Sequence, residues 1–175
     1  MEERREQLGS KPSTYIIRDE IETIVKNNKI DRIRFHEYSK LGYADIIKRF
    51  YYGFVDFEKF PYQKEKLSYL WLHFRKELTN TILCGGVNSS LENNLHKIDE
   101  YLRDRNEEKL FLILSEGWVY EGYPDEMLSV LGSIDFLIED FYIISTGFTW
   151  CIAYCDDGNC SVLYRKDKSA NENSD

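Results

Sequence analysis

The sequence predicts an α+β fold, with helices mainly in residues 14–104 and a mostly antiparallel sheet built from residues 110–165. Two observations predict it. Apolar residues recur at helical spacing in the first part of the chain, whereas after residue 110 they form short runs separated by turn residues. One helix is expected near 124–133, inserted between strands. Because helices and strands are otherwise segregated along the chain, an antiparallel sheet is favoured over alternating βαβ units.

Three helices are expected before residue 105, over residues 14–27, 67–82 and about 90–104. Ser13 is a plausible N-cap for the first. The second has the most regular amphipathic spacing, and Gly85-Gly86 would end it, since glycine suits the left-handed position after a helix. Before the third, Ser89 stands three residues ahead of Glu92, which is the spacing of a capping box.

Seven aromatic residues are concentrated in positions 50–62. Such a cluster can fill a core edge or a protein interface. It can also stack single-stranded nucleic acid where a positive groove lies beside it, and several lysines are near. We favour the core or interface interpretation. A short strand is expected over 30–35, and the conformation of the rest of 30–62 is left open.

The later strands are expected over residues 110–114, 118–120, 138–145, 148–156 and 159–165. The run 110–114 is continuously apolar, which indicates a strand buried on both faces. The inserted helix starts at Pro124, a residue favoured at the first helical position, and Asp125 and Glu126 follow in its positive N-terminal turn. Asp157-Gly158 lies between the last two strands and predicts a two-residue hairpin loop.

That loop would place Cys155 opposite Cys160 and put both thiols on one face with Cys151. Three interpretations follow. A zinc site would need further ligands, and the spacing differs from the usual C-x2-C pattern. A redox pair is disfavoured because neighbouring acids raise the pKa of a thiol. We favour buried, reduced cysteines, and we expect neither a metal nor a cofactor.

No established catalytic constellation is recognisable. His36, His73 and His96 are scattered, and the glycines match neither a phosphate-binding loop nor a dinucleotide fingerprint. Cys84, which precedes two glycines, could serve as a nucleophile only if a base lay within hydrogen-bond reach. A small hydrolase or transferase that uses Cys84 with a histidine is therefore the alternative to a non-enzymatic protein.

One globular domain accounts for the 175 residues, of which 42% are hydrophobic and 15% aromatic. We expect a flexible arm over 1–13, a single domain over 14–165 and a disordered tail over 166–175. The charged start lacks the apolar region of a signal peptide, and no apolar stretch reaches the roughly 20 residues that span a bilayer. These observations predict a cytoplasmic protein that does not contact membranes.

Acidic residues are concentrated in the second half of the chain. Residues 1–87 hold 16 basic and 13 acidic groups, whereas residues 88–175 hold 7 and 18, and the net charge is −8. Such a surface disfavours nucleic acid, whose phosphates it would repel. It either keeps the protein soluble or attracts a basic protein partner. The candidate partner contacts are Glu116, Trp118, Tyr120, Glu121, Asp125, Glu126, Glu139, Asp140, Asp156 and Asp157.

Residues 140–145 (DFYIIS), residues 148–152 (FTWCI) and the turn 156–158 (DDG) form aromatic strands joined by tight turns. This C-terminal part resembles that of small uncharacterised bacterial proteins, some of them carried in toxin–immunity loci. The resemblance implies a bacterial cytosolic protein that binds and neutralises another protein. Together with the acidic surface, it predicts a non-enzymatic binding module, in its specific form an immunity-type inhibitor of a basic partner such as a nuclease toxin.

Overall fold

A computed structural model describes residues 16–62, 67, 70–85, 89–135 and 138–166, apart from the side chains of residues 71 and 72. The helices are α1 Ile17–Asn27, α2 Tyr43–Phe54, α3 Leu91–Leu102 and α4 Pro124–Gly132, with two short 3₁₀ helices, Leu70–His73 and Arg103–Arg105. The strands are β1 Phe35–Glu37, β2 Thr79–Cys84, β3 Leu110–Leu114, β4 Val119–Gly122, β5 Phe141–Ser145, β6 Trp150–Tyr154 and β7 Cys160–Tyr164. These elements confirm the predicted α+β class.

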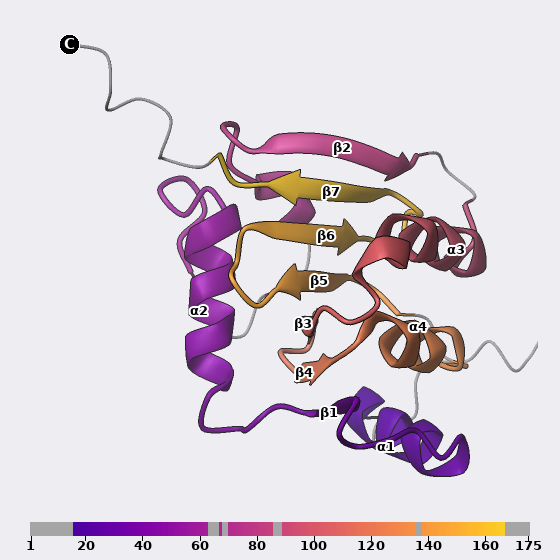
Figure 1. The fold of residues 1–175 in the computed structure, drawn as a ribbon. Helices are drawn as coiled ribbons and strands as arrows, with labels where there is room; N and C mark the ends of the chain where they lie inside the picture. Colours follow the sequence, from indigo (N-terminus) through magenta and orange to yellow (C-terminus); the bar gives the residue numbers. More distant parts are fainter. Residues whose placement is uncertain (1–15, 63–66, 68–69, 86–88, 136–137, 167–175) are drawn as a thin grey trace, which may run out of the picture.

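One seven-stranded sheet organises the described residues, in the order β1-β4-β3-β5-β6-β7-β2, and each pair of neighbours is antiparallel. Strands β3 to β7 come from residues 110–165, as predicted. Both edge strands, however, come from the first half of the chain. In Figure 1, β2 forms one edge of the sheet and β1 lies at the other, beside α1.

Helices cover both faces of this sheet. One core cluster joins α1, α3 and α4 to side chains such as Leu112 and Ile143, and the other joins α2 to Phe111 and Tyr142. Figure 1 accordingly shows α2 apart from the other three helices. Every residue of β3 and β5 is buried, because both faces of these central strands are covered. This confirms the prediction of a strand buried on both faces over 110–114.

The aromatic cluster belongs mainly to the core. Phe50, Tyr51 and Phe54 on α2 are fully buried, whereas Tyr52 keeps 48% of its surface exposed. The Tyr51 hydroxyl donates a hydrogen bond to the carbonyl oxygen of Phe60 at 2.5 Å and so fixes the segment that follows the helix. The core interpretation is therefore confirmed, and α2 supplies the helix that the sequence left open. The expected strand at 30–35 begins only at residue 35.

The predicted helix over 67–82 is wrong. Its described residues form the 3₁₀ helix Leu70–His73 and then strand β2, which pairs with β7. The apolar residues matched a helical period by coincidence, and Ile82, which the apolar face of such a helix would bury, is 71% exposed. β-branched residues at 79, 81 and 82 favour an extended chain, and β7 offers hydrogen-bond partners that a local pattern cannot reveal.

The predicted hairpin loop is also wrong by one residue. Tyr154, and not Cys155, lies opposite Cys160. Gly158 adopts a φ of 80°, and its N–H donates to the Cys155 carbonyl at 2.9 Å, so residues 156–158 form a three-residue loop. Since a slip of one residue exchanges the faces of a strand, Cys160 lies on the α3 side whereas Cys151 lies on the α2 side.

Two smaller corrections concern helix starts and strand faces. Ser90 rather than Ser89 caps α3, and its Oγ accepts a hydrogen bond from the Asn93 N–H at 3.2 Å. Phe148 has a φ of 55° and packs on the α2 side with Cys151, whereas strict alternation along the strand expected over 148–156 would put these two residues on opposite faces. The proposed cap Ser13, the arm over 1–13 and most of the tail over 166–175 lie outside the described residues.

Candidate functional site

Three turns meet at one end of the sheet. They are the β3–β4 turn at 115–118, the segment 138–140 immediately before β5, and the β6–β7 loop at 155–159. The ladder aligns them, because Leu114 lies opposite Phe141, which in turn lies opposite Tyr154. A hydrogen bond from the Ser115 N–H to the Asp140 carbonyl, at 3.1 Å, joins the first two turns. Figure 1 likewise shows β6 ending where β5 and β7 begin.

Four exposed carboxylates occupy these turns, and we call them the acidic end: Glu116, Glu139, Asp156 and Asp157. No ion pair within the described part of the chain reaches Glu116, Asp156 or Asp157. Glu116 accepts a hydrogen bond from the Ser115 hydroxyl at 3.2 Å. Three of these side chains therefore keep their negative charge uncompensated by an ion pair.

Other acidic residues of the predicted surface lie toward the opposite end of β3 and β4, where bases pair with them. Glu126 receives a hydrogen bond from Arg34 Nε at 2.5 Å. Glu121 lies 3.5 Å from both His36 Nε2 and Lys109 Nζ. Asp125 is exposed in the first turn of α4. The predicted single acidic surface is therefore divided, and Glu121 and Glu126 belong to a charge-paired region.

Two predicted contacts are buried, which corrects their assignment to the surface. Tyr120 is fully buried and stacks on Phe35 with ring centroids 5.2 Å apart. Asp140 is only 2% exposed. Neither can contact a partner without a rearrangement of the core. The pairing of Tyr120 with Leu112 in the ladder is what turns it inward.

Trp118, the other predicted anchor, is half-buried in the β3–β4 turn, next to the acidic end. Its carbonyl accepts a hydrogen bond from the Leu114 N–H at 3.0 Å, which closes the turn. Tyr43 packs edge-on against its ring at 6.4 Å, and the Arg18 guanidinium lies 5.7 Å from the ring centre. The indole is thus held in place while part of its surface remains accessible.

Cys84 shows no activating base within the described residues. Burial is the main influence on its thiol and raises its pKa, while Lys97 and a hydrogen bond with Ser89 act in the opposite direction. The histidines contact other groups: His36 lies beside Glu121, His73 stacks on Phe60 at 4.0 Å, and His96 lies 3.4 Å from Glu100. A protonated thiol without a base is a poor nucleophile.

The described residues likewise form no metal site. Within the described residues, no group of three or more histidine, cysteine, aspartate or glutamate side chains is arranged to hold a metal ion. The cysteine cluster behind the zinc alternative is divided between the two faces of the sheet, with Cys151 on one and Cys160 on the other. The described part of the chain also contains no helix of the length and apolar character needed to cross a membrane.

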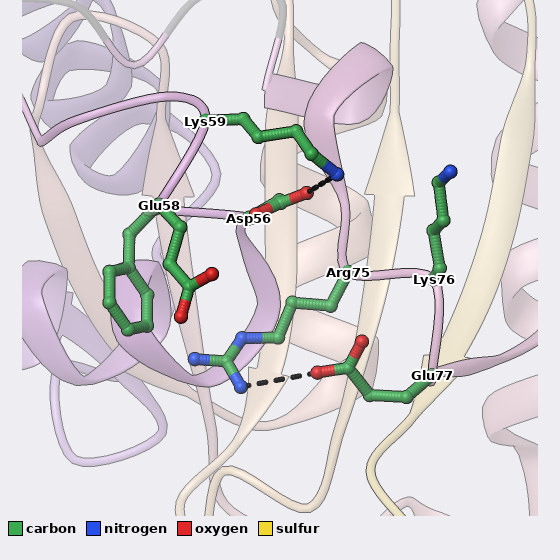
Figure 2. Close-up of a pocket in the computed structure, with 7 residues that line it drawn as sticks. Asp56, Glu58, Lys59, Arg75, Lys76 and Glu77 are labelled. Carbon is green, nitrogen blue, oxygen red and sulfur yellow. Dashed lines mark hydrogen bonds and ion pairs between the residues drawn. The ribbon is translucent and has the colours of Figure 1, made fainter.

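One pocket was not predicted from the sequence. It has a volume of about 290 Å³ and lies between residues 56–59 and 75–77, which a bridge between Val55 and Phe74 brings together. Figure 2 shows its two ion pairs, Asp56 with Lys59 at 3.0 Å and Arg75 with Glu77 at 3.4 Å. Acidic and basic side chains are balanced, so the pocket favours neither an anion nor a cation. No local sequence pattern signals this contact between separate segments.

Comparison with known proteins identifies one family. The model of a family described as "Family of unknown function (DUF6756)" matches residues 13–175. No curated protein and no solved structure matches the chain. Because the family match covers all of the described residues, this chain belongs to the DUF6756 family.

Proposed function

We propose that this chain is a non-enzymatic protein-binding module whose acidic end docks a basic protein. One observation carries the proposal: three adjacent turns present exposed carboxylates, and those of Glu116, Asp156 and Asp157 form no ion pair within the described residues. Elsewhere, Glu121 and Glu126 are held by bases. Charges of one sign on neighbouring turns add up to a local negative potential.

The arrangement suits recognition because the charges sit on a fixed framework. The Cys155 N–H donates to the Asn159 carbonyl at 3.1 Å, which closes the β6–β7 loop. Trp118 offers a held aromatic surface beside the carboxylates. Complementary charge accelerates encounter and selects partners, whereas a partly exposed tryptophan can supply binding free energy.

In its specific form, the proposal is an immunity-type inhibitor that covers the active site of a basic nuclease toxin in the cytoplasm. The support is the resemblance carried by residues 140–158 and the charge of the acidic end. A nuclease binds phosphates through lysine and arginine side chains, so its substrate surface would be complementary to clustered carboxylates. All four cysteines are free thiols, as is usual in a reducing compartment.

We expect the protein to capture basic proteins from a lysate of its source organism at low salt and to release them at high salt. Screening at 0.5 M salt shortens electrostatic attraction to a few ångströms, since the Debye length is about 10 Å at 0.1 M and about 3 Å at 1 M. Affinity capture followed by mass spectrometry measures this. A set of captured proteins that is not basic, or that is retained equally at both salt concentrations, would contradict the proposal.

The enzyme alternative makes a different prediction for Cys84. Because burial raises the pKa of its thiol, we expect alkylation by iodoacetamide to be slower in the folded protein than in denaturant at pH 7. The rate should rise with pH as the thiolate forms. Mass spectrometry of the Cys84 peptide measures both rates. If Cys84 instead reacts faster in the folded protein at pH 6–7, its thiol is activated and the enzyme alternative gains support.

A further inference from the structure

The register between β6 and β7 separates Cys160 from Cys155, and the register between β2 and β7 places Cys160 opposite another cysteine. Cys84, the last residue of β2, is the ladder partner of Cys160, the first residue of β7. Both side chains pack against the core cluster of α1, α3 and α4, so they lie on the same face of the sheet. Both are free thiols.

Ladder partners are close enough to be bridged. Directly opposite Cα atoms in an antiparallel pair are about 4.5–5.5 Å apart, and disulfides join Cα atoms that are about 4.4–6.8 Å apart. A β-bulge between Ile82 and Cys84 alters the local register, so that Cys84 shares the face of Cys160 instead of the face of Ile82. The bulge is therefore what makes two cysteines neighbours at the open edge of the sheet.

The two thiols differ in access. Cys160 is 1% exposed, whereas Cys84 is half-buried. A small reagent would therefore meet Cys84 first. Cys155 is the competing partner because it pairs with Asn159, the residue next to Cys160, whereas Cys151 is buried on the opposite face.

We propose that Cys84 and Cys160 form a reversible cross-strand disulfide when the protein meets a low-molecular-weight disulfide such as oxidised glutathione. At alkaline pH, which ionises the Cys84 thiol although burial raises its pKa, the thiolate attacks one sulfur of the oxidant, forms a mixed disulfide and releases one glutathione thiolate. The Cys160 thiolate then attacks Cys84 Sγ and releases the second. The protein gives up two protons and two electrons, and the oxidant is reduced to two thiols.

The bond would fasten the edge strand β2 to β7, immediately beside the β6–β7 loop of the acidic end. It would join residues 84 and 160 and so close the chain between them into a covalent loop. Because a cross-link restricts the unfolded chain, the oxidised protein should resist denaturation better than the reduced protein. This inference does not depend on the proposed function, since it concerns the pairing of two thiols alone.

The test is oxidation of the full-length protein with oxidised glutathione at alkaline pH, followed by intact mass measurement and peptide mapping without reduction. We expect loss of two hydrogen atoms, a Cys84–Cys160 peptide, a higher midpoint of urea denaturation, and full reversal by dithiothreitol. Cys155→Ser should still form the bond, whereas Cys84→Ser should not. Because the bond is mapped on the wild-type protein, this test remains valid even if a cysteine variant fails to fold.

Four outcomes would overturn the inference. They are a bond between Cys155 and either Cys84 or Cys160, a stable glutathione adduct on Cys84 that does not close, a protein whose Cys84 stays reduced, and cross-linking that persists in Cys84→Ser. Each of these leaves the salt-dependent capture of a basic partner unaffected, so the two proposals fail separately.

Discussion

Reversal of three charges at the acidic end, in the variant E116K/D156K/D157K, should slow association with the captured basic partner by about 10- to 1,000-fold at low salt. These three side chains form no ion pair within the described residues, so each substitution changes the potential directly rather than breaking an internal pair. Stopped-flow or surface binding kinetics measure the association rate constant. The effect should shrink as salt is raised, because screening weakens steering.

The matched control changes the net charge equally at the opposite end of β3. Asp104, Glu107 and Asp125 are exposed and lie just before β3 or just after β4. Glu107 also lies 3.4 Å from Arg34 Nη1, so its substitution removes one ion pair in addition to the charge. The variant D104K/E107K/D125K should change the association rate constant far less than the acidic-end variant. Equal slowing by both variants would show that total charge, and not the acidic end, governs encounter.

Truncation of Phe50 should destabilise the fold by about 3–5 kcal/mol, the cost of removing a large buried aromatic side chain. Phe50 is fully buried on α2, and its ring lies 4.8 Å from that of Tyr142 and 5.9 Å from that of Phe54. Such aromatic contacts add to the loss of burial. Urea denaturation of Phe50→Ala measures the free energy of unfolding.

Tyr52 on the same helix provides the control. It is 48% exposed, so Tyr52→Ala should cost less than about 1 kcal/mol. A similar decrease in the free energy of unfolding for both variants would mean that α2 is not held against the sheet by the side chains described above. A small decrease in the free energy of unfolding for Phe50→Ala would show that the core cluster around α2 repacks to fill the space left by the removed ring.

Where the sequence predicted the fold well, local chemistry decided the structure. The apolar run Leu110–Leu114 became a strand buried on both faces, and Pro124 with two following acidic residues began α4 as expected. In both cases the signal lies within a few neighbouring residues. A proline at the first helical position needs no information from elsewhere in the chain.

The sequence-based predictions were wrong where contacts with distant segments of the chain determine the local structure. Strand β2 exists because β7 pairs with it, although its own residues fitted a helical period. The β6–β7 loop gained one residue because Gly158, and not the pair Asp157-Gly158, takes the left-handed position. That single residue moved Cys160 to the other face and made Cys84 its partner.

Charge placement was the least predictable feature. The sequence showed many carboxylates after residue 107 but not their partners. Arg34 and Glu126 are 92 residues apart in the chain, yet they pair at 2.5 Å. Tyr120 and Asp140 were predicted to be surface contacts, but both are buried. Only the fold separates the acidic end from the region whose carboxylates are neutralised.

Hydrogen–deuterium exchange on the complex with the captured basic protein tests the docking claim most directly. We expect slower exchange on binding for amides in residues 115–118 and 155–159, and little change around residues 104–109 and 121–126. That result would place the partner over Glu116, Asp156 and Asp157. Slower exchange confined to the charge-paired end, with 115–118 and 155–159 unaffected, would contradict the proposal that the acidic end is the docking surface.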